Sequence, residues 1–327
     1  MSIVGLLAQS SRPALEPSPR MAAAILLLLI ALSIISPWFA LRLGVQRPQN
    51  VDGPVRHTRA DSFWLFVLIL AGAVVIQSLG AVMLTPLMAG MPDRQQRLAA
   101  AMLATSLGFV LIVAANHRAR PDGTRSIGLL PQNARPGLSA GAAGLLIVLP
   151  WLFWLMMGAY LLLEQLGIRP DTEHDVFRLW QQNETTAAFR IISVFAAVIL
   201  APLAEETFFR GILQTAMVKL FSDWLGRSVP PASATTGPVI PVAGSLPAEE
   251  TSPPATVPRA ARWLAIVATS LLFALIHRPW FIQPPIFLLS LGLGYVYERT
   301  GNLWSAIFMH MLFNGVQFGI FLLAYAR

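Results

Sequence analysis

The stretch APLAEETFFRGIL, residues 201–213, places two acids and an arginine inside an apolar part of the chain. Residues 191–200 before it and 214–218 after it carry no charged side chain. A charge at the centre of a membrane helix costs about 2.5–3.5 kcal/mol on insertion scales, so three together cost on the order of 8 kcal/mol. Ordinary charges at a membrane surface are the alternative, but the apolar sequence on both sides argues against it. We therefore expect these side chains to serve a buried site.

The spacing of the three charges separates their roles. Glu206 and Arg210 stand four residues apart with the acid first, which favours an ion pair on a helix. Glu205 lies about 100° around the helix axis from Glu206 and has no obvious local counter-ion. One carboxylate is therefore expected to be structural, and its neighbour is free for chemistry.

Two later apolar segments each carry further polar residues. His277 ends the segment LLFALIH, and His310 and Asn314 lie in FMHMLFNG, four residues apart and so on one helix face. A single histidine or asparagine in such a helix usually makes only a hydrogen bond between helices. Intramembrane polar groups face the bundle interior and one another, so residues of this kind on three separate segments favour a shared site.

Together these residues provide one free carboxylate, two imidazoles and an amide. A carboxylate assisted by a histidine activates water as a general base, and a second histidine with an asparagine can donate hydrogen bonds to an oxyanion. This set would suffice for amide hydrolysis without a serine or cysteine nucleophile, and no cofactor is then required. A zinc ion held by Glu205, His277 and His310 is the alternative, and the sequence does not separate the two. The absence of H-E-x-x-H argues only against the common zincin arrangement.

Composition assigns the chain to the membrane proteins. Of its 327 residues 55% are hydrophobic and 12% are charged, whereas a soluble domain has roughly a quarter charged residues. The chain has no cysteine, which excludes disulfides and a cysteine nucleophile. The net charge of +7 does not indicate nucleic acid, because most basic residues flank apolar runs and suit anionic lipid headgroups.

Apolar runs predict an all-α fold, a polytopic bundle of about eight transmembrane helices in an integral, multi-pass membrane protein (of the cell membrane, if bacterial). A retained helix at the first segment is favoured over a cleaved signal peptide, because the run is long and lacks a clear A-x-A cleavage site. The positive-inside rule places both termini outside the cytoplasm. The expected segments are residues 21–43, 63–89, 98–115, 138–163, a fifth from 187, 262–277, 286–297 and 303–325.

The remaining sequence completes the organisation. Residues 1–327 are read as one membrane domain with a catalytic core at about 187–325. Pro202 removes a backbone hydrogen bond and is expected to kink the fifth helix just before the acidic motif. Residues 176–182 predict a short interfacial helix, and the proline-rich residues 222–260 predict a flexible loop. Gly315 and Gly319 have a G-x-x-x-G spacing, which lets helices approach closely.

At these residues the chain resembles the CAAX-protease and bacteriocin-processing (CPBP, or Abi) family of intramembrane endopeptidases. The family's motifs E-E-x-x-x-R, F-x-x-x-H and H-x-x-x-N occur here in the family's order. They match Glu205, Glu206 and Arg210; Phe273 and His277; and His310 and Asn314. Each motif is weak alone, whereas the ordered set on membrane segments is specific. Over residues 1–185 the resemblance rests on the hydrophobic helices alone.

The resemblance implies that the chain is a CPBP-type protease of the glutamic or metal-dependent type. Glu205 and His277 would activate water, and His310 and Asn314 would form the oxyanion site. The expected partners are the lipid bilayer and a peptide or protein substrate, membrane-associated or lipidated in part of the family.

The resemblance also assigns supporting roles and has one clear departure. Glu206, Arg210 and Phe273 would shape the site or contact the substrate. The eukaryotic branch has Asn after the paired glutamates, and this chain has Thr207, so removal of residues from prenylated proteins is not assumed. The alternatives are a non-catalytic membrane scaffold or bacteriocin-immunity protein that binds a peptide and, less favoured, a proton-coupled transporter. A transporter would be expected to show internal repeats, and no second E-E-x-x-x-R-like segment occurs in the N-terminal half.

Overall fold

The computed structural model describes residues 19–42, 63–119, 127–168, 175–182, 184–227, 257–277 and 279–325, and every regular element among them is a helix. The α-helices are α1 (Pro19–Arg42), α2 (Phe63–Leu84), α3 (Asp93–Ala119), α4 (Ala134–Gln165), α5 (Asp175–Trp180), α6 (Ala187–Phe195), α7 (Ala201–Glu206), α8 (Thr215–Arg227), α9 (Arg259–Leu275), α10 (Gln283–Thr300) and α11 (Leu303–Tyr325). The short elements are η1 (Thr85–Met88), η3 (Pro131–Asn133), η6 (Trp280–Ile282) and the two π-helical segments η4 (Ala196–Leu200) and η5 (Thr207–Gln214). The all-α prediction is therefore confirmed for the described residues.

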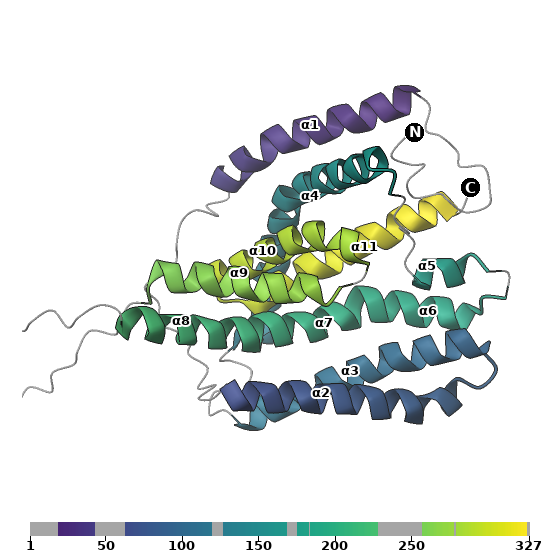
Figure 1. Cartoon of the computed structure of the whole chain (residues 1–327), viewed down its shortest axis with the longest axis horizontal. Helices are drawn as coiled ribbons and strands as arrows, with labels where there is room; N and C mark the ends of the chain where they lie inside the picture. The colour runs from purple at the N-terminus through teal and green to yellow at the C-terminus, as the bar shows by residue number, and fades with distance from the viewer. Residues whose placement is uncertain are drawn as a thin grey trace, which may run out of the picture.

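The helices stack in layers (Figure 1). The hairpin of α2 and α3 lies on one side of the long helix that runs from α6 to α8. On the other side of the long helix lie α9, α10 and α11, and α4 packs on both α10 and α11. Helix α1 covers the outer side of α4. The residues of the three motifs lie on the long helix, on α9 and the turn directly after it, and on α11, so the site lies between these layers.

Among the described residues, four helices are long and apolar enough to cross a membrane: Pro131–Gln165, Ala187–Gly226, Trp280–Thr300 and Leu303–Leu323. Shorter apolar helices occur at Leu26–Ser36 and Val75–Met88. Many large apolar side chains are exposed on the helix surfaces, as a lipid solvent requires. The chain is thus an integral membrane protein, and the count of about eight spans stays a prediction.

The long helix departs from α-helical geometry on both sides of the acidic motif. Before the motif, Ala201 donates its backbone N–H to Ala196, the i→i+5 pattern of a π-helix. Pro202 follows directly, at the start of α7. A wide π turn thus precedes Pro202 in a helix that continues to Arg227, and the kink expected at the proline stays a prediction. The bounds of the predicted loop 222–260 are wrong at both ends, because α8 continues to Arg227 and α9 begins at Arg259; residues 228–256 lie outside the described part.

A tight turn connects α10 to α11 and fixes their relative position. Gly301 takes the left-handed conformation (φ 56°) and donates its N–H to Tyr297 over 2.8 Å, which ends α10. The Asn302 side chain accepts from the N–H of Trp304 over 3.1 Å and so caps α11. The same side chain donates to the carbonyl of Asn133 over 2.8 Å, which holds the turn against the segment before α4.

Small residues bring α4 and α11 together, and they are not the glycines that the G-x-x-x-G spacing singled out. A side chain at Gly319 would meet no atom within 4 Å, and one at Gly315 would meet only Val198 at 3.8 Å. The close approach occurs at Gly137 and Gly141, where an added Cβ would meet atoms of α11 at 2.5 and 2.6 Å. This pair has the same four-residue spacing but faces a neighbouring backbone.

We expect Gly141→Ala to destabilise the bundle by about 1–3 kcal/mol, the usual cost of overpacking. The new Cβ would lie 2.6 Å from the carbonyl oxygen of Ser305 and 2.8 Å from the nitrogen of Met309, both backbone atoms that can move only with α11. Thermal melting of the purified protein in detergent measures the effect. Gly158→Ala, on the same helix with nothing within 4 Å, is the control. Equal melting temperatures for the two variants would contradict this packing.

Candidate active site

Glu206 and Arg210 form the predicted i, i+4 ion pair. Arg210 Nη1 donates to Glu206 Oε1 over 3.0 Å, and both side chains are buried, with exposed fractions of 0% and 1%. Arg210 also donates through Nη2 to the hydroxyl of Ser290 over 2.6 Å and to its backbone carbonyl over 3.2 Å. The guanidinium therefore ties the long helix to α10.

The same oxygen of Glu206 reaches a third helix. His310 Nδ1, on α11, lies 2.8 Å from Glu206 Oε1. Because the carboxylate accepts, the histidine holds a proton on Nδ1 and turns Nε2 the other way. Oε1 of Glu206 is thus shared by an arginine and a histidine, whereas its other carboxylate oxygen, Oε2, is buried with no hydrogen-bond partner among the described residues.

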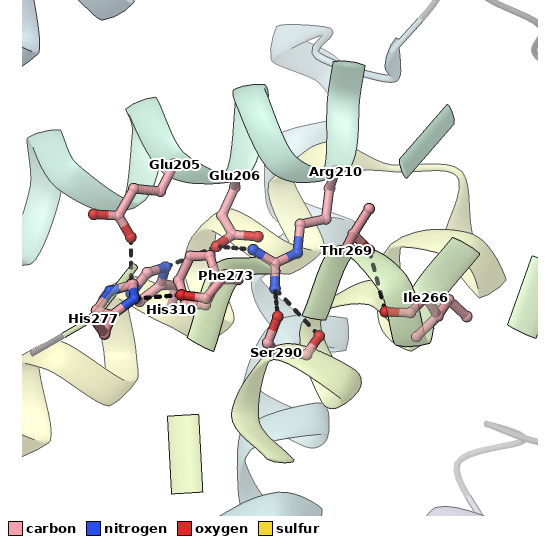
Figure 2. A network of polar contacts seen from close by, with 9 residues as sticks. All are labelled: Glu205, Glu206, Arg210, Ile266, Thr269, Phe273, His277, Ser290 and His310. Atoms are coloured by element: carbon pink, nitrogen blue, oxygen red, sulfur yellow. Dashed lines mark hydrogen bonds and ion pairs between the residues drawn. The ribbon is translucent and has the colours of Figure 1, made fainter. Parts of the chain in front are cut away.

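Glu205 is oriented differently from its neighbour. Its side chain is 28% exposed, and its Oε2 lies 4.0 Å from His310 Nε2, beyond direct hydrogen-bond length. Figure 2 shows Glu205 pointing toward the two histidines, while Glu206 points toward Arg210 and Arg210 reaches Ser290. The two adjacent carboxylates therefore have different surroundings, one dry and paired and the other open.

His277 lies just beyond the end of α9, where the sequence placed it at the helix terminus. Its Nδ1 lies 2.6 Å from the carbonyl of Phe273, so this nitrogen donates and caps the end of the helix. The remaining ring nitrogen, Nε2, then carries the lone pair in the neutral ring. Gln283, at the start of α10, donates to the backbone carbonyl of His277 over 3.1 Å and holds the turn that presents the histidine.

The ring of Phe273 lies among the charged and imidazole groups. It is 1% exposed, and the Arg210 guanidinium carbon lies 4.7 Å from its centroid, a cation–π distance. Its centroid lies 4.5 Å from that of His277 and 5.9 Å from that of His310. Phe273 thus packs against the guanidinium of the buried ion pair and against both imidazole rings.

Asn314 has a different partner from the other motif residues. It lies one turn after His310 on α11, and its Nδ2 donates to the backbone carbonyl of Ala197 over 2.8 Å. Ala197 is part of the π segment η4 that precedes Pro202. The structure therefore places Asn314 against the same long helix as the acids, with one amide hydrogen engaged there.

Ser290 and a second polar network between the long helix and α10 were not predicted from the sequence. Gln214 donates to the carbonyl of Gly294 over 3.1 Å and to Glu298 over 3.4 Å, and Glu298 pairs with Arg262 at 3.2 Å. The sequence held one signal for it. Polar residues recur every four positions at 206, 210 and 214, and the partners on α10 recur every four positions at 290, 294 and 298.

The arrangement does not form a metal-binding set as it stands. Over the described ranges, which include Glu205, His277 and His310, no three His, Asp or Glu side chains are grouped to hold an ion. One ring nitrogen of each histidine, Nδ1 of His277 and Nδ1 of His310, is hydrogen-bonded to a protein oxygen and so is not available as a metal ligand. We derive no step through a metal.

We expect Ser290→Ala to lower the melting temperature, because the buried Arg210 guanidinium loses its 2.6 Å hydroxyl partner. Hydrogen bonds to charged groups contribute about 1.5–3 kcal/mol. Thermal unfolding in detergent gives the measurement. Ser139→Ala, which removes an exposed hydroxyl from α4, is the matched control. A Ser290 variant as stable as the control would show that the hydroxyl is not needed to hold Arg210.

Comparison with known proteins gives one family match. Residues 187–316 match the family model described as Rce1-like, Type II CAAX prenyl endopeptidase Rce1-like. No curated protein and no solved structure shows significant similarity to the chain. The matched residues begin at α6 and include the three motifs in α7, η5, α9 and α11 together with α10. Residues 187–316 are therefore similar to the type II CAAX prenyl endopeptidases, and this match supports the resemblance of the chain to the CAAX-protease and bacteriocin-processing family of intramembrane proteases.

Proposed function

We propose that the protein is an intramembrane endopeptidase that hydrolyses a peptide bond with a water activated by Glu205 and His277. The observation that carries this proposal is the divergence of the two adjacent glutamates. Glu206 is engaged by Arg210 and His310 and has no exposed surface, whereas Glu205 is 28% exposed. The paired carboxylate of Glu206 stabilises the fold, whereas the exposed carboxylate of Glu205, beside the two imidazoles, can accept a proton.

The tautomer of His277 supports its role as a base. Its Nδ1–H is held by a neutral backbone carbonyl, so Nε2 is free to accept a proton from water. With Glu205 it takes the proton of the attacking water as the new oxygen–carbon bond forms. The proton then passes to the leaving amine as the carbon–nitrogen bond breaks.

The surroundings of His310 support a role at the oxyanion. Its Nδ1 faces the ionised Glu206, and a carboxylate at this position stabilises a ring that carries protons on both nitrogens. The Nε2–H would then donate to the negative oxygen of the tetrahedral intermediate, and the second amide N–H of Asn314 would assist. The 4.0 Å gap between His310 Nε2 and Glu205 Oε2 suits a bridging water, which at hydrogen-bond lengths of about 2.8 Å would be bent by roughly 90°.

Glu206, Arg210 and Phe273 would act as the framework of the site. The burial of all three, and the contacts of Arg210 with Glu206 and with the Phe273 ring, support a positioning role rather than contact with substrate. Truncating one partner of such a buried pair leaves the other charge uncompensated, at a cost of about 3–5 kcal/mol.

The proposed substrates are peptides or proteins that reach the site from the membrane. The matching family is described as prenyl endopeptidases, but Thr207 is fully buried where the eukaryotic branch has Asn. Both prenylated and unmodified peptides therefore belong in the test.

We expect Glu205→Gln to lower the rate of peptide cleavage by about 10²–10⁴-fold, the usual contribution of a general base. The amide keeps the size of the side chain and removes its capacity to accept a proton. The measurement uses the purified full chain in nanodiscs with a library of prenylated and unmodified peptides, read by mass spectrometry with and without a chelator. Glu164→Gln, the same change at an exposed site on α4, is the control and should cleave at the rate of the parent protein.

The outcomes separate the competing functions. Cleavage by Glu205→Gln at the parent rate would overturn the assigned base. Loss of cleavage on chelation, restored by zinc, would replace the cofactor-free mechanism. Peptide binding without cleavage by the parent protein would favour a non-catalytic peptide-binding protein, and substrate-driven proton uptake in proteoliposomes would favour a transporter.

A further inference from the structure

The π segment η4 leaves a backbone carbonyl without its expected helical donor. In this segment the N–H of Ala201 bonds to the carbonyl of Ala196, five residues earlier. In the same pattern the donor to the Ala197 carbonyl would be residue 202. That residue is a proline and has no N–H. The wide turn and the proline together remove the partner of one carbonyl on the helix that carries the acids.

A side chain of α11 supplies the missing hydrogen-bond donor to the Ala197 carbonyl. Asn314 Nδ2 lies 2.8 Å from the Ala197 oxygen, and because a carbonyl can only accept, the amide nitrogen is the donor. A carbonyl away from water needs such a partner, and in a membrane the need is greater. The contact joins residues 117 positions apart in the chain.

We propose that Asn314 is a positioning residue whose amide replaces the N–H that Pro202 lacks, and so fixes α11 at the register that places His310 between Glu205 and Glu206. Asn314 follows His310 by one turn, on the same face of α11. The two contacts, His310 with Glu206 at 2.8 Å and Asn314 with Ala197 at 2.8 Å, therefore hold one face of α11 to the long helix at two points. The catalytic consequence of this inference rests on the proposed function; the hydrogen-bond exchange does not.

This role is separable from a contact with the oxyanion, because an amide nitrogen carries two hydrogens. The substitution Asn314→Leu keeps the approximate size and removes both. Pro202→Ala restores a backbone N–H that can serve the Ala197 carbonyl and touches no other function of Asn314. If the amide positions α11, the proline substitution should repair part of what the asparagine substitution damages.

The test is a double-mutant cycle with Asn314→Leu, Pro202→Ala and the double variant, using the full chain in nanodiscs. We expect Asn314→Leu alone to lower the melting temperature by roughly 3–6 °C. Cleavage of the best library peptide should fall through kcat by about 10²-fold with little change in KM. In the Pro202→Ala background the loss of melting temperature should shrink by at least half, and kcat of the double variant should recover about tenfold over Asn314→Leu. Gln317→Leu, which removes an exposed amide from the same helix, should change neither quantity.

Three results would overturn the proposal. One is a loss of kcat in Asn314→Leu with an unchanged melting temperature, which would assign the amide to the substrate alone. Another is an equal fall in melting temperature with and without the proline. The third is a recovery of melting temperature without any recovery of kcat. Should Pro202→Ala fail to fold, Pro202→Ser restores the same N–H and replaces it. Thermal melting needs no substrate, so it tests whether the Asn314 amide replaces the missing N–H of Pro202 even if Glu205→Gln does not lower cleavage. A failure of this proposal is therefore distinguishable from a failure of the proposed function.

Discussion

The carboxylate of Glu206 is the group on which the site depends. One of its oxygens accepts from Arg210 on the long helix and lies 2.8 Å from His310 on α11, while Arg210 reaches Ser290 on α10. An unpaired charge at this depth would be strongly unfavourable, so the three helices are stable together only when these contacts form. Assembling the bundle and assembling the site are therefore the same event.

These contacts leave one face of the long helix buried and the adjacent face, about one residue around the helix, partly exposed. Glu206 and Arg210 are enclosed, with the ring of Phe273 packed against the guanidinium. Glu205 stands about 100° around the axis and is 28% exposed, next to the histidines. Each imidazole is held through Nδ1, His277 by a backbone carbonyl and His310 by a carboxylate. Orientation of this kind before substrate arrives is the main way in which a protein site lowers the cost of reaction.

The irregular geometry of the long helix lies next to the acids of the site. Two π segments, η4 and η5, flank the short α7 that carries both acids. Such wide turns are frequent at functional sites because they redirect side chains and free backbone groups for other partners. Beyond the site the same helix faces continue with Gln214 against Gly294 and Glu298, so polar contacts between the long helix and α10 extend past the motif residues.

The sequence by itself determined the helices and the local pairing. Hydrophobic runs identify helical segments because lipid leaves the backbone no other partner, and the bounds of the last helix, 303–325, agree with α11. The four-residue spacing of Glu206 and Arg210 was enough to predict their contact, because helix geometry alone brings such residues together. Only the tertiary structure decided which distant groups meet. It pairs Arg210 with Ser290, 80 residues away, and Asn314 with the Ala197 carbonyl, 117 residues away. It also places the close helix packing at Gly137 and Gly141, and not at Gly315 and Gly319. Each of these depends on which helix face meets which, and that is settled by the packing of the whole bundle rather than by any one segment.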